Sequence, residues 1–330
     1  MSQSFDIAVV GATGLVGEAL LMALDEREFP VGSLYPLASD AAIGQVAAFR
    51  ERNLRVRAAA DFDFVSVALV FLVEPLPAAQ LARIEAAGCA LVDLSGTLEA
   101  GRAPCVVAGL NPQAVRGRWL RSPLPATVAL ASVLGALGKV QTLRRVTVTA
   151  ALAVSSRGRE GVEELARQTA QLLNARPVEP QLFDRQIAFN LLARASDELA
   201  DGHARDERRL AGELGEVLAA PQLPVAVTCL QAPVFFGDSL AVSLLCAEPV
   251  DLAVVRRCLD DADDLELVEA GDYPTAVGDA LGQDLVYVGR LRAGLLDPCE
   301  LNLWIASDNV RKGSALNAVQ LGELLLNAYL

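Results

Sequence analysis

Three glycines near the start of the chain have a spacing that fits the binding of a dinucleotide. Gly11, Gly14 and Gly17 follow an apolar segment, residues 5–10, that we expect to be a strand, and they precede a helical pattern over residues 15–24. In such a turn the first glycine permits the tight bend, the second lets the backbone approach a pyrophosphate, and the third lets the helix pack closely. The N-terminus of the helix offers unpaired N–H groups to the anion. The predicted cofactor contacts are Gly11, Thr13, Gly14, Leu15, Val16 and Gly17.

The turn after the second expected strand, "YPLASDAAIG", bears on the choice of cofactor. Asp40 is its only charged residue, and no arginine or lysine lies near it in the sequence. A carboxylate can bind a ribose hydroxyl, whereas the 2′-phosphate of NADP would find no cation. The turn therefore favours NAD over NADP. Each of these two predictions has an alternative. Asp40 could be a solvated turn residue rather than a ribose contact, and the glycines could serve only the packing of an ordinary strand–helix unit.

Nucleophilic and acid–base side chains are scarce in this sequence. The stretch "RSPLPATVALASVLGAL", residues 121–137, predicts a loop and then an apolar helix that begins near Pro125, and nothing in it attacks a carbonyl well. The six cysteines form no CxxC pair, so we expect buried, reduced thiols, with Cys229 facing a strand core. The one histidine, His203, lies in a polar segment and is expected to be solvated. We therefore expect no metal site.

The pattern of elements changes after residue 137. Before it, strands are expected over residues 63–72 and 89–95, with a helix over residues 77–88 between them, which is typical of a parallel sheet covered on both faces. After it, longer strands with helices between them predict an α+β domain with a mainly antiparallel sheet. Long apolar strands with one open face commonly pair across a subunit interface, so the pattern favours a homodimer.

A chain of 330 residues is about right for two domains. We place a dinucleotide-binding domain at residues 1–124 and a second, substrate-type domain at residues 125–310. Residues 311–330 carry apolar side chains at helical spacing, and we expect this C-terminal helix to pack back on the first domain and complete it.

The charge of the chain limits its partners. It holds 41 acidic against 28 basic residues, a formal net charge of −13, which repels nucleic acid and anionic membranes, so neither is an expected partner. No basic and apolar leader opens the sequence, and the longest uncharged stretch, residues 122–138, is below spanning length. A cytoplasmic location is the resulting expectation.

Several sequence blocks occur together in an order that resembles one enzyme family. "GATGLVG", "VSSRGREGVEELARQT", "FN" at residues 189–190, "PVFFGDS" and "WIASDNVRKGSALNAVQ" follow one another as in aspartate-semialdehyde dehydrogenases. The resemblance covers nearly the whole chain. More specifically, the chain looks like the usg-type paralogs of that enzyme, which have no assigned reaction. It implies a Rossmann-like domain and an α+β dimerisation domain.

The resemblance also implies an oxidoreductase of amino-acid biosynthesis that acts on aldehyde or oxo groups. Its members carry out the reversible reductive dephosphorylation of an acyl phosphate with NAD or NADP. Such chemistry needs a thiolate that forms a thioester, a histidine that moves a proton and an arginine that grips a carboxylate. The segments that approach the cofactor in the family correspond here to Ser155, Gly158, Asn309 and Gly313.

The positions that carry this chemistry in the family differ in this chain. Pro125 replaces the cysteine nucleophile, Asp238 replaces the histidine, and Gln231 replaces the arginine that grips the substrate. Glu99 stands where a phosphate-binding arginine is expected. The resemblance therefore implies that none of the catalytic residues is intact.

Two further correspondences concern the cofactor turn and the substrate. Ala41 and Ala42 replace an arginine–serine pair in the cofactor turn. Glu207 corresponds to a glutamate that holds the substrate amine, and Arg209 takes the place of a phosphate-binding lysine. These two residues are the predicted substrate contacts.

Three hypotheses follow from the sequence. In the first, a dimeric protein with a semialdehyde dehydrogenase-like fold has lost the parent reaction and binds a dinucleotide as a binding or regulatory module. In the second, an active oxidoreductase reduces a carbonyl without a thiolate, and Asp238 is the acid. In the third, the protein is structural and its cleft is empty.

Overall fold

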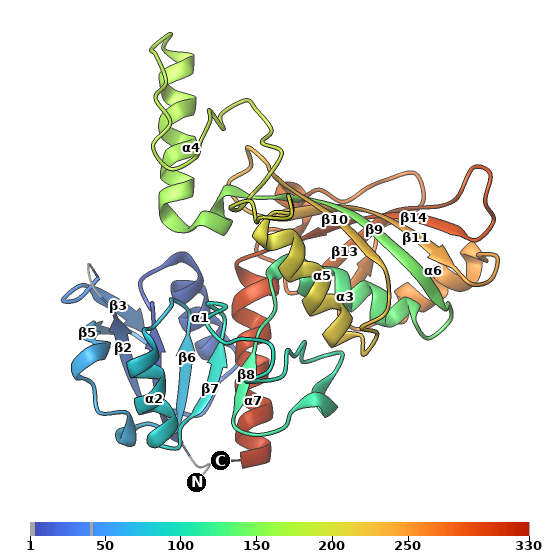
Figure 1. Cartoon of the computed structure of the whole chain (residues 1–330). Coiled ribbons are helices and arrows are strands. Elements are labelled where there is room, and N and C mark those ends of the chain that lie inside the picture. The colour runs from blue at the N-terminus through green and yellow to red at the C-terminus, as the bar shows by residue number, and fades with distance from the viewer. Residues whose placement is uncertain (1–3, 40–41, 330) are drawn as a thin grey trace. The chain divides into compact units, whose positions relative to one another are not determined.

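The computed structural model describes residues 4–39 and 42–329, and it divides into two compact units (Figure 1). The first comprises Met1–Pro123 with Ser314–Leu330, and the second comprises Leu124–Gly313. The chain thus leaves the first unit just before the segment that begins near Pro125, and its last residues return to that unit.

A six-stranded parallel sheet forms the first unit, in the order β5-β2-β1-β6-β7-β8. The neighbours of β1, namely β2 and β6, extend the sheet to opposite sides, so the topological switch point lies at the C-terminal end of β1, where the glycine turn follows. The strands are β1 (Phe5–Val10), β2 (Val31–Ala38), β5 (Arg57–Ala58), β6 (Leu69–Leu72), β7 (Ala90–Asp93) and β8 (Trp119–Arg121).

Helices cover both faces of this sheet. On one face, Leu20 and Leu24 of α1 (Leu15–Glu26) and Leu321 and Leu325 of α7 (Asn317–Tyr329) share one core. On the other face, α2 (Ala78–Ala86) contributes to a second core. A hairpin of β3 (Val46–Phe49) and β4 (Arg52–Arg55) packs beside them. The C-terminal helix therefore completes the core of the N-terminal unit. Figure 1 shows this helix, α7, in red beside β7.

The second unit holds a six-stranded mixed sheet in the order β10-β9-β11-β14-β13-β12. Its three central ladders are antiparallel, whereas β9–β10 and β12–β13 at the edges are parallel. The mainly antiparallel sheet expected from the sequence is confirmed for the centre. The strands are β9 (Leu143–Leu152), β10 (Val225–Gln231), β11 (Asp238–Cys246), β12 (Leu265–Leu267), β13 (Val286–Ala293) and β14 (Glu300–Ser307).

One face of this mixed sheet packs against helices. The apolar helix α3 (Pro125–Leu137) contacts β11, β13 and β14 and is buried at ten of its thirteen residues. Helices α5 (Arg205–Val217) and α6 (Leu252–Asp260) pack beside it, and α4 (Gly158–Leu173) follows β9. On the opposite face, Thr147, Ala226 and Ala241 lie exposed in three neighbouring strands. One face of the sheet is thus open in the isolated chain.

Two expected elements differ from the structure. The strand predicted over residues 63–72 is limited to β6, because the Asp63 carboxylate accepts a hydrogen bond from the backbone N–H of Val65 and stabilises a short 3-10 turn, Phe64–Ser66. The C-terminal helix predicted from residue 311 starts with a wide π-type turn, Arg311–Leu316. There the Gly313 N–H reaches back to the carbonyl of Asp308 at 2.9 Å, so the regular helix begins only at Asn317.

Within the described part of the chain, no helix combines the length and the apolar character that a bilayer crossing requires.

Candidate functional site

The glycine turn of the first unit is built for close approach of the backbone. Gly11 has a φ of +88°, and its N–H donates to the carbonyl of Leu37 at 2.8 Å. A Cβ on Gly17 would lie 2.1 Å from the carbonyl oxygen of Gly11, so only glycine lets α1 pack this closely on the turn. Gly14 is the N-cap of α1 and makes no side-chain capping bond. The N-cap residue therefore places no side chain of its own on the backbone N–H groups of the first turn of α1.

A carboxylate that the sequence analysis did not single out lies beside this turn. Glu74 follows β6, and a Cβ on Gly11 would contact its backbone and side chain at about 3.1 Å. Its Oε1 accepts hydrogen bonds from the backbone N–H of Ser39 at 2.9 Å and from the Ser39 hydroxyl at 3.3 Å. Glu74 was detectable only as a charge at a strand end, which is a weak signal. The predicted ribose contact Asp40, and Ala41 beside it, lie outside the described residues.

At the tip of α3 in the second unit, Pro125 occupies the first helical position and Leu124 is the N-cap. A Cβ on Gly313 would lie 2.5 Å from the Cβ of Pro125, so the proline ring is packed directly against that glycine. Proline suits the first turn of a helix because its missing N–H is not needed there. The side chain at this tip is half-buried and offers neither a nucleophile nor a proton donor.

A buried glutamate anchors this helix tip from α5. Glu213 is 5% exposed, and its Oε2 accepts from the backbone N–H of Leu124 at 2.8 Å and from the Thr127 hydroxyl at 3.0 Å. Its Oε1 accepts from Nε of Arg209 at 2.6 Å. The predicted phosphate contact Arg209 is therefore bound to a carboxylate that caps α3. Sequence reasoning missed Glu213, because only the fold brings it to residues 86 and 89 positions away.

The predicted substrate contact Glu207 also serves the local structure. Its Oε2 accepts from the backbone N–H of Ala204 at 2.8 Å, which caps α5, and its Oε1 accepts from the backbone N–H of Cys229 at 3.0 Å. The carboxylate thus ties α5 to β10. Binding of a substrate amine by Glu207 stays a prediction.

Three polar residues form a row across the second sheet. Gln231 pairs with Leu152, the backbone N–H of Ala153 donates to Oδ1 of Asp238 at 2.9 Å, and Asp238 pairs with Ser307. In-register neighbours point to the same face of a sheet, and this is the face that α3 covers. Positions predicted separately from the sequence, Gln231 and Asp238, are therefore brought together on one face.

The row carries unusual electrostatics. Burial raises the pKa of Asp238 to about 7; the hydrogen bond from Ala153 opposes this rise, and the charges of Asp308 and Asp206 add to it. Gln231 is fully buried and its Nε2 donates to the carbonyl of Leu152 at 2.8 Å. Among the described residues, neither Oε1 of Gln231 nor the hydroxyl of Ser307 has a hydrogen-bond partner. The row thus offers a carboxyl group that keeps its proton up to about pH 7 and two polar atoms without a hydrogen-bond partner in the part of the chain that the structure describes.

Two residues predicted to approach the cofactor, Ser155 and Asn309, contact each other and are both buried. Nδ2 of Asn309 donates to the Ser155 hydroxyl at 3.0 Å, and Oδ1 of Asn309 accepts from the backbone N–H of Gly237 at 2.9 Å. Gly158 starts α4 with a φ of +70°. The side chains of Ser155 and Asn309 thus brace the turn that leads into Asp238, and their role with a cofactor stays a prediction.

Two further side chains of reactive types are Cys229 and His203. Burial, with the nearby charges of Asp206, Glu207 and Asp238, raises the pKa of the Cys229 thiol to about 12, so almost none is thiolate at neutral pH. His203 is 63% exposed and lies 3.8 Å from the Glu207 carboxylate. Within the described ranges, no group of three or more His, Cys, Asp or Glu side chains could hold a metal ion.

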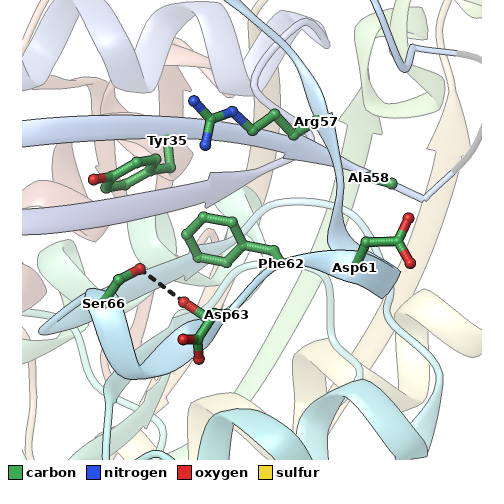
Figure 2. Close-up of a pocket in the computed structure, with 7 residues that line it drawn as sticks. All are labelled: Tyr35, Arg57, Ala58, Asp61, Phe62, Asp63 and Ser66. Atoms are coloured by element: carbon green, nitrogen blue, oxygen red, sulfur yellow. Dashed lines mark hydrogen bonds between the residues drawn. The ribbon is translucent and has the colours of Figure 1, made fainter.

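A hollow of about 500 Å³ lies in the first unit beside β2 and β5; Figure 2 shows the residues that line it. The Arg57 guanidinium lies 5.6 Å from the centroid of the Tyr35 ring, and the Ser66 hydroxyl donates to the carbonyl of Asp63 at 2.7 Å. None of the predicted site residues lines it, so it is separate from the glycine turn. The hollow is lined by Tyr35, Arg57, Ala58, Asp61, Phe62, Asp63 and Ser66.

Comparison with known protein families shows the family to which the chain belongs. Residues 6–118 match the family model described as semialdehyde dehydrogenase, NAD binding domain, and residues 134–312 match the model described as semialdehyde dehydrogenase, dimerisation domain. The protein therefore belongs to the semialdehyde dehydrogenase family, and the resemblance drawn from its sequence blocks is confirmed.

Two individual relatives show which members of the family the chain is similar to. The chain is 55% identical over 336 residues to the USG-1 protein homolog of Pseudomonas aeruginosa and 37% identical over 336 residues to aspartate-semialdehyde dehydrogenase 2 of Vibrio cholerae, with 100% of each chain covered.

Solved structures match over the full length. A probable aspartate-semialdehyde dehydrogenase from Pseudomonas aeruginosa matches with a TM-score of 0.96 and 55% identity, covering 99% of this chain and 100% of that one. Aspartate semialdehyde dehydrogenase II of Vibrio cholerae, complexed with ASA, matches with a TM-score of 0.94 and 35% identity over 100% of both chains. The α/β fold with a parallel NAD-binding sheet and a mixed dimerisation sheet is thus common to these proteins.

Proposed function

We propose that this protein is a homodimer that binds a nicotinamide dinucleotide, NAD in preference to NADP, and does not convert acyl phosphates through a cysteine thioester. In this proposal it acts as a cytoplasmic binding or regulatory module of the semialdehyde dehydrogenase family. Residues 1–124 with 311–330 are the proposed dinucleotide-binding domain, and residues 125–310 are the proposed dimerisation domain.

The observation that carries the proposal is the proline at the tip of α3. Pro125 has no nucleophilic atom, and the Gly313 backbone packs against its ring. The nearest hydroxyl on this helix, that of Thr127, is buried and donates to Glu213. A thioester requires a thiolate, and a buried hydroxyl bonded to a carboxylate that already accepts from Leu124 and Arg209 supplies almost no nucleophile at neutral pH.

Support for dinucleotide binding comes from the glycine turn. Gly14 makes no side-chain capping bond at the N-terminus of α1, and the turn stands at the switch point of a parallel sheet, where dinucleotides bind in folds of this type. The Glu74 carboxylate beside Ser39 supports the preference for NAD, because it would repel a 2′-phosphate and could accept from a ribose hydroxyl.

Calorimetric titration of the full chain with NAD and with NADP tests this proposal. We expect one dinucleotide bound per chain, with the tighter binding for NAD. If NADP binds more tightly than NAD, the proposed preference for NAD is wrong. If neither nucleotide binds, the proposed dinucleotide binding is wrong and the hypothesis of a structural protein remains.

The proposed dimer uses the open face of the second sheet. Small side chains of three neighbouring strands, among them Thr147, Ala226 and Ala241, are exposed there, which suits the flat packing of two sheets. The family model that matches residues 134–312 is itself a dimerisation domain.

Replacing Ala241 by arginine is expected to convert the dimer to a monomer, because the interface would bury an unpaired charge. Light scattering during size-exclusion chromatography measures the mass. The matched control is Ala100→Arg, at an exposed position of the first unit, which should remain a dimer. A dimeric Ala241→Arg protein would exclude this face as the interface.

A second candidate function is carbonyl reduction without a thiolate, and the Asp238 carboxyl favours it. A bound reduced nicotinamide would supply the hydride to the carbonyl carbon. Asp238 accepts from Ala153 through Oδ1, so Oδ2 is left to carry the proton that the carbonyl oxygen takes. A pKa of about 7 keeps this proton available near neutral pH.

If this candidate is right, Asp238→Asn lowers the rate of carbonyl reduction by about 10²- to 10⁴-fold. The wild-type rate should be highest below pH 7 and fall about tenfold per unit above it, because only the protonated carboxyl acts. Oxidation of the reduced cofactor, followed across a panel of aldehydes and ketones, measures both effects. A rate that does not depend on pH between 6 and 9 would remove Asp238 as the acid.

A further inference from the structure

Two cysteines lie opposite each other at one end of the second sheet. The ladder between β11 and β14 ends with the pair Leu245 and Glu300, and the next residues are Cys246 and Cys299. The backbone N–H of Cys246 donates to the carbonyl of Cys299 at 2.8 Å, and the N–H of Cys299 donates to Oδ1 of Asp297 at 2.8 Å, so one hydrogen bond of the antiparallel pairing extends to the two cysteines. Residues paired in this way have Cα atoms about 4.5–5.5 Å apart, within the range of about 4.4–6.8 Å that a disulfide requires.

The two thiols lie near each other and differ in exposure. Cys246 ends β11, and Leu244 two positions before it is buried against the helices, so the Cys246 side chain points to that face. Cys246 is 2% exposed, whereas Cys299 is half-exposed in the turn immediately before β14. Burial and the neighbouring Cys299 raise the pKa of the Cys246 thiol. Cys299 is therefore the thiol that a reagent from solution meets first.

The other four cysteines lie in different surroundings. The Cys89 thiol donates to the carbonyl of Phe64 at 3.1 Å, and the Cys258 thiol donates to the carbonyl of Ala136 at 3.0 Å. Cys105 and Cys229 are fully buried. All six cysteines belong to the described residues and are reduced in this structure, and the strand register sets Cys246 opposite Cys299 alone.

We propose that Cys299 is a site of modification by small disulfides such as oxidised glutathione, and that Cys246 then resolves the adduct into an intramolecular disulfide. In the first step the Cys299 sulfur bonds to one sulfur of the small disulfide, whose S–S bond breaks, and the first small thiol leaves with the proton from Cys299. In the second step the Cys246 sulfur attacks the Cys299 sulfur, and the second small thiol leaves with the proton from Cys246. Two cysteine thiols are oxidised by two electrons, and the small disulfide is reduced to two thiols.

The new bond would act on the fold rather than on the candidate site. β11 runs from Asp238 to Cys246, so the cysteine pair lies at the opposite end of the strand from the polar row. The bond closes residues 246–299, which include α6, β12 and β13, into a loop and restricts the unfolded chain. The connection between β13 and β14, where Leu295 and Leu296 are almost fully exposed, would be tied to the end of β11. We expect the oxidised protein to unfold at a higher temperature and to bind dinucleotide unchanged.

Thiol counting on the full-length protein tests this inference. Treatment with oxidised glutathione, followed by denaturation and titration of free thiols, should lower the count from six to four without a stable glutathione adduct. Mass spectrometry of a tryptic digest should identify the Cys246–Cys299 link. The midpoint of thermal unfolding should rise by several degrees and return after treatment with dithiothreitol.

Two variants make the result specific. Cys258→Ser, which removes the other half-exposed thiol, should still lose two thiols on oxidation. Cys299→Ser should form no such link and show no thermal shift, and Cys246→Ala should stop at one glutathione on Cys299. A count that stays at six, or a link between other cysteines, would overturn the inference.

Discussion

Replacing Gly14 by glutamate abolishes dinucleotide binding if the glycine turn is the site. Gly14 has extended backbone angles, φ −76° and ψ 166°, that any residue adopts, and a Cβ there would meet its nearest neighbour at 3.6 Å. The variant should therefore fold. Its carboxylate would stand over the N-terminus of α1 and repel the pyrophosphate, which we expect to weaken binding by about 100-fold or more.

Calorimetry against NAD measures this effect, and two comparisons make it specific. Gly212→Glu, at an exposed position of α5 with open space around it, should bind as the wild type does. Gly17→Ala is not a suitable probe, because its Cβ would lie 2.1 Å from the Gly11 carbonyl and would disturb the fold itself. Equal affinity of the Gly14→Glu protein and the wild type would place the nucleotide elsewhere.

The second large effect concerns the buried carboxyl of Asp238. Its pKa is about 7 in the folded protein and 3.8 in the unfolded chain, so between these values the folded state holds a proton that the unfolded state has lost. The free energy of unfolding therefore falls as pH rises from about 4 to about 7 and is constant above that range. In the Asp238→Asn variant the side chain does not titrate, so this fall in the free energy of unfolding disappears. The amide oxygen of the new side chain can still accept the hydrogen bond from the N–H of Ala153.

We expect the stabilisation by Asp238→Asn to be larger at pH 8 than at pH 5 by about 3 kcal/mol. Urea unfolding measures it, with Trp119 replaced by phenylalanine in every variant so that Trp304 of β14 reports the second unit. The control Asp263→Asn, at an exposed position, should show no such dependence. If the stabilisation by Asp238→Asn is the same at pH 5 and at pH 8, the pKa of Asp238 is not raised in the folded protein.

Local patterns were sufficient to predict the glycine turn of the first unit and the start of α3. The glycine spacing fixed the turn after β1, and Pro125 marked the start of α3, because both are rules of a few neighbouring residues. The strand expected over residues 63–72 was too long, because the side chain of Asp63 competes locally with strand pairing. Whether this hydrogen bond forms depends on the backbone geometry, and the pattern of apolar residues carries no information about that geometry.

The candidate site of the second unit could be predicted only in part. Asp238 and Gln231 were recognised through the family resemblance, but their neighbour Ser307 belongs to a strand far along the chain, and only strand register places it beside Asp238. Glu213 was missed for the same reason, since it caps α3 from another helix. Long-range packing, rather than any local signal, makes these contacts.

The assay that tests the central claim most directly supplies the purified protein with aspartate semialdehyde, phosphate and either NAD or NADP and follows cofactor reduction. We expect no turnover above the protein-free blank with either cofactor, because Pro125 offers no nucleophile at the tip of α3 and burial raises the pKa of the Cys229 thiol to about 12. Turnover that depends on all three substrates would contradict this account.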